Sequence, residues 1–320
     1  MSPAGWMCVT LLAWAQIGDT FPLPSPLDES TALTTFERSE FPSPGSVPFA
    51  LPQPSTPPPE PALASEELSL PASRWTAIWL APGGAHGFGI TDLDFNHTYL
   101  LGYDDLPPLH IPPGMGMHLW TGPSDLNLPP RVYDLYIDFL WRPIERERSG
   151  LSFGITPGFY GDFQRFDGHT FQLTGWALGN YRFGAHWNAV GGLAYVRQLR
   201  SHWLPVGGLV WTPSEDTRLE FVIPKPRFVR RYRSDENGSA FWYLAGQLGG
   251  GAWAVADTAT TSVLVSYSDL RLLVGLESFR VTGREWNAEA GYVFSRHLAI
   301  DGQSTTSPTS TVLLQLSTAF

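Results

Sequence analysis

The last ten residues of the chain alternate between apolar and polar side chains. The segment from Thr311 to Phe320 reads Thr-Val-Leu-Leu-Gln-Leu-Ser-Thr-Ala-Phe. Steps of two back from the end give a mostly apolar face: Phe320, Thr318, Leu316, Leu314 and Val312. Because successive side chains of a β-strand point to opposite faces, the pattern predicts a strand with one apolar face. Its length is about what a strand needs to cross a bilayer.

Four earlier segments repeat this alternation and carry aromatic residues near both ends. They are Arg131–Trp141, Thr170–Phe183, Ala185–Gln198 and Glu285–Arg296. A membrane has two interfaces, which favour aromatic residues at strand ends and small or aliphatic residues between them. A soluble β-sandwich has no comparable reason for this order. The pattern therefore indicates membrane-spanning strands.

From Arg74 onward the chain reads as strands separated by turn residues. Besides the five segments above, we expect strands at Arg74–Ala81, Phe88–Tyr99, Leu109–Trp120, Leu151–Gly161, Trp203–Thr212, Thr217–Ile223, Ala240–Val255 and Ser262–Glu277. This total is odd, whereas a closed barrel formed by one bacterial chain has an even number of strands. The sequence therefore predicts an all-β antiparallel transmembrane β-barrel of about 12 strands, within a range of roughly 10 to 14. Arg74–Ala81 is then a lead-in or interior segment.

The chain before Arg74 has a different character. Residues 1–15 hold a short apolar run that ends in Ala13-Trp14-Ala15, a small-x-small pattern typical of signal-peptide cleavage, although no Lys or Arg precedes the run. Residues 16–73 are rich in Pro and Ser, and proline lacks the amide donor that helices and sheets use. The expected organisation is a signal peptide at 1–15, a disordered linker at 16–73 and a β-barrel at 74–320.

Composition and charge support an envelope protein over most other classes. The formal net charge of -10 argues against a nucleic-acid partner, which requires a basic face. Only 16% of residues are charged, while 13% are aromatic. No stretch approaches the ~18 apolar residues of a transmembrane helix. The single cysteine, Cys8, excludes an internal disulfide and a cysteine-based zinc site.

The closing strand resembles the last strand of bacterial outer-membrane β-barrels. This resemblance implies that Val312, Leu314, Leu316 and Phe320 form a membrane-insertion signal. It also implies two partners, the barrel-assembly machinery and outer-membrane lipid. The implied location is the bacterial outer membrane.

Several short motifs extend the resemblance to residues 74–320. Examples are Ile111-Pro112-Pro113-Gly114, Leu204-Pro205-Val206-Gly207-Gly208 and Ala290-Gly291-Tyr292-Val293-Phe294. They resemble an uncharacterised family of outer-membrane barrels known mostly from planctomycete-type genomes. The family implies a fold and a location, and it supplies no substrate, cofactor or catalytic residue.

Charged residues on predicted strands are candidates for the barrel interior. Asp134 and Asp138 share the face opposite the apolar side chains of their segment. They lie about 13 Å apart by the strand rise, which is too far for a catalytic carboxylate pair. We expect them to face the lumen and to pair with arginines of other strands, for which the candidates are Arg182, Arg197, Arg218 and Arg271. Such pairs could line a channel or plug it.

One dense basic run occurs in this acidic chain. It consists of Lys225, Arg227, Arg230, Arg231 and Arg233. Anionic lipid head groups at a membrane rim would attract such a run. The alternative is a solvated loop.

Catalytic and cofactor motifs are weak. Gly150-Leu151-Ser152-Phe153-Gly154 matches the hydrolase pattern G-x-S-x-G, but it lies inside a predicted strand with no helix after it. The eight histidines show no spacing that nominates a base or a metal site. Gly249-Gly250-Gly251 lacks the Lys-Ser/Thr and the helix of a phosphate loop, so we expect it to let a neighbouring side chain pack closely.

These observations predict a non-enzymatic outer-membrane barrel, without cofactor or metal, that acts as a small channel or a structural envelope protein. Two alternatives remain. One is a barrel enzyme acting on lipids, a hydrolase or acyltransferase, which a Ser–His pair at one rim would support. The other is a secreted β-sandwich that binds carbohydrate, in which the apolar faces would turn inward.

Overall fold

The computed structural model describes residues 73–84, 87–103, 106–122, 126–146, 148–197, 201–236, 238–257, 261–280, 284–303 and 305–320. The predicted signal peptide at 1–15, Cys8 and the predicted linker up to residue 72 lie outside these residues. Within the described part, no helix is long and apolar enough to span a membrane.

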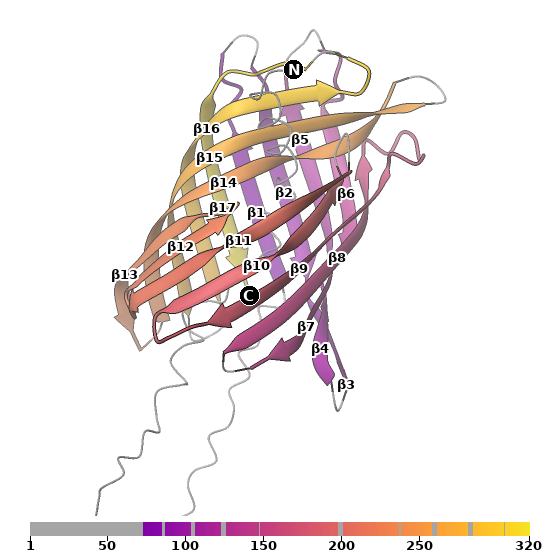
Figure 1. Cartoon of the computed structure of the whole chain (residues 1–320). Helices are drawn as coiled ribbons and strands as arrows, with labels where there is room; N and C mark the ends of the chain where they lie inside the picture. The colour runs from indigo at the N-terminus through magenta and orange to yellow at the C-terminus, as the bar shows by residue number, and fades with distance from the viewer. Residues whose placement is uncertain are drawn as a thin grey trace, which may run out of the picture. The chain divides into compact units, whose positions relative to one another are not determined.

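The described residues form one sheet of seventeen strands that closes on itself (Figure 1). The first nine are β1 (Ser73–Leu80), β2 (Gly89–His97), β3 (Tyr99–Tyr103), β4 (Leu106–Ile111), β5 (Pro113–Thr121), β6 (Arg131–Ile137), β7 (Phe139–Glu145), β8 (Ser149–Gly161) and β9 (Phe171–Arg182). The others are β10 (Trp187–Arg197), β11 (Ser201–Ser214), β12 (Thr217–Ile223), β13 (Arg227–Asp235), β14 (Gly238–Ala256), β15 (Ser262–Arg280), β16 (Glu285–Ile300) and β17 (Thr311–Ala319). Neighbouring strands run antiparallel, except for one parallel bridge between β14 and β8. β1 pairs with both β2 and β17, which closes the ring.

Three pairs of strands are continuous through one interrupting residue. β2 and β3 are separated by Thr98, β4 and β5 by Pro112, and β6 and β7 by Asp138. Pairing between β2 and β5 continues as pairing between β3 and β4, so the interruptions do not change the order of the wall. Seventeen strands less these three joins give a wall of fourteen, an even number as a closed barrel requires.

Two expectations about the strands are corrected. The wall of fourteen has more strands than the expected twelve and lies at the upper limit of the expected range of 10 to 14, because Arg227–Asp235 forms β13 and not a loop. The arginines of β13 interrupt the apolar alternation from which the other strands were predicted. Arg74–Ala81 is not a lead-in, because β1 occupies the wall between the last strand and β2.

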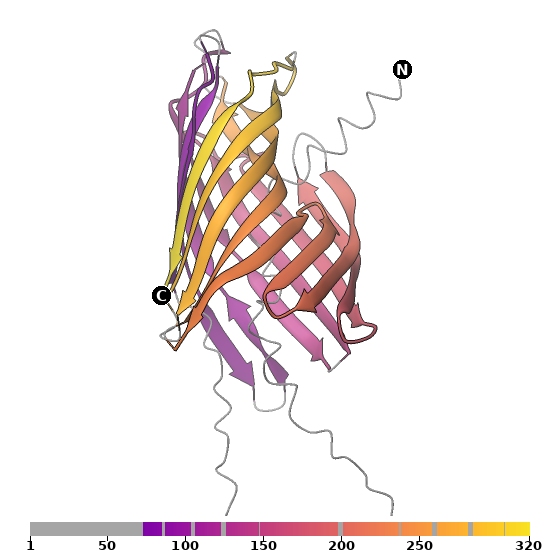
Figure 2. The ribbon, with the colours of Figure 1, turned by 90° about the vertical axis from the view of Figure 1, so that its left-hand side faces the viewer.

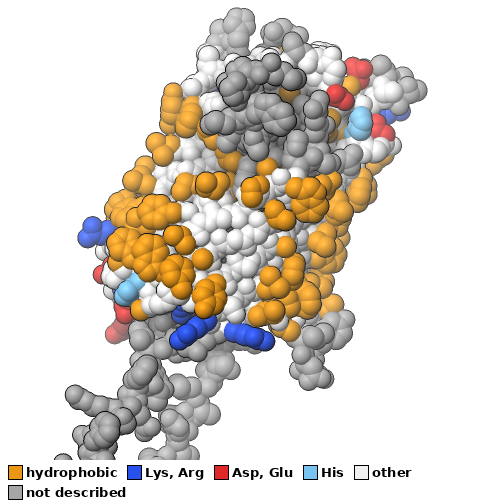
Figure 3. Space-filling model, in the orientation of Figure 1, with side chains coloured by type: hydrophobic (Ala, Val, Ile, Leu, Met, Phe, Trp, Pro, Cys, Tyr) orange, Lys and Arg blue, Asp and Glu red, His pale blue; other side chains and the backbone are white. Residues whose placement is uncertain are grey.

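The apolar side chains of the wall face outward. On β17, Val312, Leu314 and Leu316 are 51%, 53% and 57% exposed, whereas Leu313 between them is 1% exposed. Leu272, Val274 and Leu276 repeat the pattern on β15: all three are exposed. Figure 3 shows hydrophobic side chains spread over the flanks of the wall, with charged side chains above and below them. Outward apolar faces are the arrangement of a membrane barrel and the reverse of a soluble sandwich.

The wall narrows toward the end opposite Ser73 and Phe320. The β12–β13 hairpin is short, so pairing of β11 with β12 begins at Gly207 and pairing of β14 with β13 ends at Ala245. Beyond that point β14 forms a backbone bridge from Ala254 to Gly161 of β8. Nine strands therefore surround this narrow end: β1, β2, β5, β6, β8 and β14–β17.

Strands β9–β11 form a second layer over the narrow end of β14 and β15. In Figure 2 the salmon strands separate from the orange β14 and β15 toward the top. Leu248 of β14 is buried in one cluster with Leu178 of β9, Ala194 of β10 and Leu204 of β11. The outward side of β14 thus faces protein here, and both of its sides are buried.

Candidate functional site

The inward faces of β2, β5 and β6 carry an acidic cluster organised by a histidine. His118 Nδ1 lies 2.7 Å from Asp92 Oδ1, and its Nε2 lies 2.8 Å from Asp134 Oδ2. Asp94 accepts a hydrogen bond of 3.1 Å from the Tyr136 hydroxyl. Gly116 lies between Asp94 and Asp134 in the register, where a β-carbon would come within 3.4 Å of both. The missing side chain leaves room for the carboxylates and the imidazole.

Trp253 reaches this cluster from β14, which lies next to β8 at the narrow end. Its Nε1–H donates to Asp134 Oδ1 at 2.8 Å, and its ring lies 4.9 Å from the His118 ring. Both oxygen atoms of the Asp134 carboxylate therefore have a hydrogen-bond partner, His118 on β5 for one and Trp253 on β14 for the other. The contact joins β14 to β6 over the inward face of β8 at the narrow end.

The two predicted lumen aspartates both face inward, with partners other than those expected. Asp134 binds His118 and Trp253, while Asp138 accepts a 2.5 Å hydrogen bond from Thr156 on β8. Asp138 is buried at the break between β6 and β7. The expectation of arginine partners from other strands is wrong for the contacts that Asp134 and Asp138 make.

Two of the candidate arginines form ion pairs with acidic residues of their own strands instead. Arg218 binds Glu220 at 2.9 Å and Arg271 binds Asp269 at 2.7 Å, each two residues away on the same strand face. Arg182 is half-buried at the end of β9. Arg197 belongs to β10, but its side chain lies outside the described residues.

The glycine run of β14 has the packing role that the sequence suggested. A β-carbon at Gly249 would lie 2.2 Å from the Arg271 guanidinium carbon, and one at Gly251 would lie 2.6 Å from the Trp253 ring. Both side chains therefore lie flat against the strand, which only glycine permits.

The basic run is divided between the two faces of β13 and its turns. Arg227 points inward, 2.9 Å from Glu277 and 4.2 Å from the Tyr243 ring centroid, which removes it from the head-group candidates. Arg231 binds Asp216 at 2.7 Å, and Arg233 binds Asp235 at 2.7 Å. Arg230 is exposed, and Lys225 is half-buried in the preceding turn.

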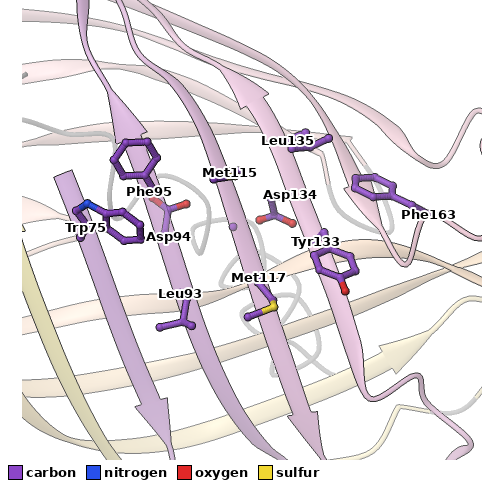
Figure 4. A pocket seen from close by; sticks show the side chains of 11 residues that line it. Trp75, Leu93, Asp94, Phe95, Met115, Met117, Tyr133, Asp134, Leu135 and Phe163 are labelled. Atoms are coloured by element: carbon purple, nitrogen blue, oxygen red, sulfur yellow. The ribbon is translucent and has the colours of Figure 1, made fainter. Parts of the chain in front are cut away.

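An apolar groove of about 460 Å³ crosses the outer face of β1, β2, β5 and β6 (Figure 4). The outward side chains that line it are Trp75, Leu93, Phe95, Met115, Met117, Tyr133 and Leu135, together with Phe163 of the β8–β9 loop. Phe163 stacks on Tyr133 with ring centroids 6.0 Å apart. The groove is part of the outward apolar surface.

The catalytic motifs receive little support from the geometry. Ser152 lies in the middle of β8, with no helix after it. Among the described residues, no group of three or more His, Cys, Asp or Glu is arranged to hold a metal ion. One Ser–His pair does occur at a rim: Ser73 Oγ lies 2.8 Å from His97 Nδ1, beside the chain end.

Sequence reasoning missed His118, Asp92 and Trp253. Each occupies an inward position of a predicted strand, and that alternation was the available signal. Which inward residues meet depends on the register between strands and on the bridge from β14 to β8, neither of which the sequence specifies.

Comparison with known proteins finds similarity in structure and none in sequence. No protein-family model matches it, so membership of the uncharacterised family is not shown. No curated protein matches it by sequence.

The chain resembles the NanC porin (8% identity, TM-score 0.37, covering 78% of this chain and 99% of that one). It also resembles an outer membrane channel from Pseudomonas putida F1 (13%, 0.36, 78% and 94%) and LpxR from Salmonella typhimurium (9%, 0.36, 78% and 100%). The chain thus resembles bacterial outer-membrane β-barrels, and at these identities and TM-scores no function follows.

Proposed function

We propose that this chain is a non-enzymatic β-barrel of the bacterial outer membrane that acts as a small channel. The observation that carries the proposal is the outward band of apolar side chains on a closed wall. In water such a band would be unstable, whereas in a bilayer it faces lipid and every backbone group of a closed wall can find a partner. The same band argues against a soluble, carbohydrate-binding sandwich.

The size of the wall and its inward charges favour a channel over a purely structural protein. Eight strands enclose a space that their own side chains fill, whereas barrels of about 16 strands leave an aqueous passage. A wall of fourteen strands is closer to the size that leaves an aqueous passage than to the size that side chains fill. The inward faces carry the carboxylates around His118 and the arginine–acid pairs of β12–β15, which suit a water-filled interior.

The closing strand suits a role as an insertion signal. Val312, Leu314, Leu316 and Phe320 all point outward and remain accessible until lipid or a partner covers them. We assign the barrel-assembly machinery as the partner that reads this strand. Outer-membrane lipid is the second partner, with Arg230 as the best-placed residue of the basic run for its anionic head groups.

Heat-modifiability of the full chain tests the barrel, and planar-bilayer conductance tests the channel. A closed barrel refolded in detergent resists SDS until it is boiled, so boiled and unboiled samples should migrate differently. We expect such a shift and discrete conductance steps. Identical migration with solubility in the absence of detergent would refute the membrane barrel, and a shifted band without any conductance would refute only the channel.

A second candidate function rests on the pair formed by Ser73 and His97. A hydroxyl hydrogen-bonded to an imidazole is the core of a nucleophilic site, and this pair lies next to Trp75 and Phe95 of the apolar groove. An esterase or acyltransferase acting on membrane lipid is the corresponding activity. Hydrolysis of p-nitrophenyl esters and of phospholipid in mixed micelles tests it. Activity that Ser73→Ala abolishes and Ser152→Ala preserves would establish the enzyme; no hydrolysis by the folded barrel would exclude it.

A further inference from the structure

Four aromatic side chains meet inside the narrow end of the barrel. They are Phe88, Trp120, Trp253 and Tyr267, and each is at most 7% exposed. Ring centroids lie 5.6 Å apart for Phe88 and Trp120, 5.4 Å for Phe88 and Tyr267, and 5.4 Å for Trp120 and Trp253. They come from β5, β14, β15 and the segment before β2, so they join opposite sides of the nine-stranded end. We call these four residues the aromatic plug.

The plug is fixed by hydrogen bonds at two of its corners. Trp253 is tied to Asp134, whose second oxygen is held by His118. At the other corner, Arg296 Nε donates to the Tyr267 hydroxyl at 2.8 Å, and its Nη2 donates to the Phe88 carbonyl oxygen. A side chain that is held both by a hydrogen bond at its polar atom and by packing of its ring is fixed in one orientation.

Trp253 differs from the other three in its polar contact. Phe88 and Tyr267 meet from opposite sides of the narrow end, and Trp120 packs against Phe88 and Trp253. Trp253 alone hydrogen-bonds a carboxylate, that of Asp134 on β6. The absent side chain of Gly251 lets the indole lie along β14. Replacing this one ring would remove the contact between β14 and the cluster around His118.

We propose that the aromatic plug is the constriction of this barrel and that Trp253 sets its width. The inference rests on the proposed channel. Solutes that enter from the wide end, which holds the chain terminus, pass the acidic cluster and then meet the plug. The passage past the plug limits conductance because the nine-stranded end is the narrow part of the wall and its centre holds four large rings.

Single-channel conductance of the full chain in planar bilayers with KCl tests the proposal. Wild type is expected to conduct weakly, and Trp253→Ala should raise the conductance several-fold. Trp253→Leu, which keeps an apolar side chain of intermediate volume and is the safer variant for folding, should give an intermediate value. Trp203→Ala is the matched control, because Trp203 is 70% exposed on the outer face of β11 and should leave the conductance unchanged.

The possible conductance results distinguish failure of the proposed plug from failure of the proposed channel. Equal conductance of wild type, Trp253→Leu and Trp253→Ala, with heat-modifiable barrels throughout, would overturn the plug and leave the channel intact. No conductance from any of these folded barrels would overturn the channel function itself, and the plug with it. An increase that Trp203→Ala also produces would mean general loosening of the wall and would overturn the specific role of Trp253.

Discussion

The two halves of β14 use the same outward face in different ways. Leu244, in the half nearer the end of the wall that holds Ser73 and Phe320, is 43% exposed and faces the surroundings of the barrel. Leu248, four residues further along the same face, is buried under β9–β11. The difference arises because β13 ends its pairing at Ala245, after which β14 bends behind the second layer to meet β8. An apolar outward face can therefore be covered by lipid or by protein, and the length of a neighbouring hairpin decides which.

The largest expected effect is that of a charged side chain placed on each half of β14. Leu248→Arg would place an unpaired cation in a dry contact between two protein layers, at a cost of about 3–5 kcal/mol. Leu244→Arg should cost less, since a long side chain on an open face can extend toward the head groups. Urea unfolding of the refolded barrels, followed by tryptophan fluorescence, measures both. Equal destabilisation would show that both halves have the same surroundings and that the second layer is absent.

A backbone change in the covered half should have the next largest effect. Gly250 has a φ of +122°, and a β-carbon there would approach the Tyr267 carbonyl oxygen to 2.0 Å. Gly250→Ala should therefore lose about 1–3 kcal/mol from the strained backbone alone. Gly191→Ala is the control, because a β-carbon at that position of β10 meets nothing within 4 Å. The same unfolding assay applies, and a neutral Gly250→Ala would contradict the described path of β14.

The smallest expected effect on stability is that of a substitution in the β8–β9 loop, which is hydrogen-bonded to β15 at the narrow end. Asp167 of the β8–β9 loop accepts hydrogen bonds from the Ser262 amide (3.2 Å) and hydroxyl (2.5 Å) at the start of β15. The Ser262 hydroxyl lowers the pKa of Asp167. A carboxyl whose pKa is lowered on folding contributes stability above its unfolded-state pKa of about 3.9, and this contribution is lost as the pH falls through the folded value.

Asp167→Asn should therefore cost a little stability at pH 7 and reduce the acid sensitivity of the barrel. Denaturant midpoints at neutral pH and at acidic pH measure both changes. Asp301→Asn, in the exposed β16–β17 turn, is the control and should match wild type at both. An Asp167→Asn barrel with unchanged acid sensitivity would exclude this contact as a fastening of the narrow end.

Alternation along single strands was enough to predict the class of fold and which face of β17 is apolar. Phe171, Leu173 and Tyr181 on β9 follow the same rule, since all three are exposed. The rule works where one side of a strand meets an apolar environment and the other meets the interior. It fails at β13, where Arg227 and Arg230 interrupt the apolar alternation.

The interior site could not be predicted because it depends on contacts between distant strands. Asp134 was placed inward correctly, but its partner Trp253 lies 119 residues away and approaches only because β14 crosses to β8. In the same way, the aspartates were expected to pair with arginines, yet Arg218 and Arg271 have acidic residues two positions away on their own faces. Each of these two arginines therefore has an ion-pair partner on its own strand.

Accessibility that alternates with every residue along β17 would show whether the outward face of the wall meets lipid. Single cysteines at Val312, Leu313, Leu314 and Leu316, in a Cys8→Ser background, would carry nitroxide labels in the full chain refolded into liposomes. We predict that labels at 312, 314 and 316 collide with oxygen and are shielded from a water-soluble nickel complex, while the label at 313 is shielded from both. Strong collision with the nickel complex at 312, 314 and 316 would place this face in water and contradict the membrane barrel.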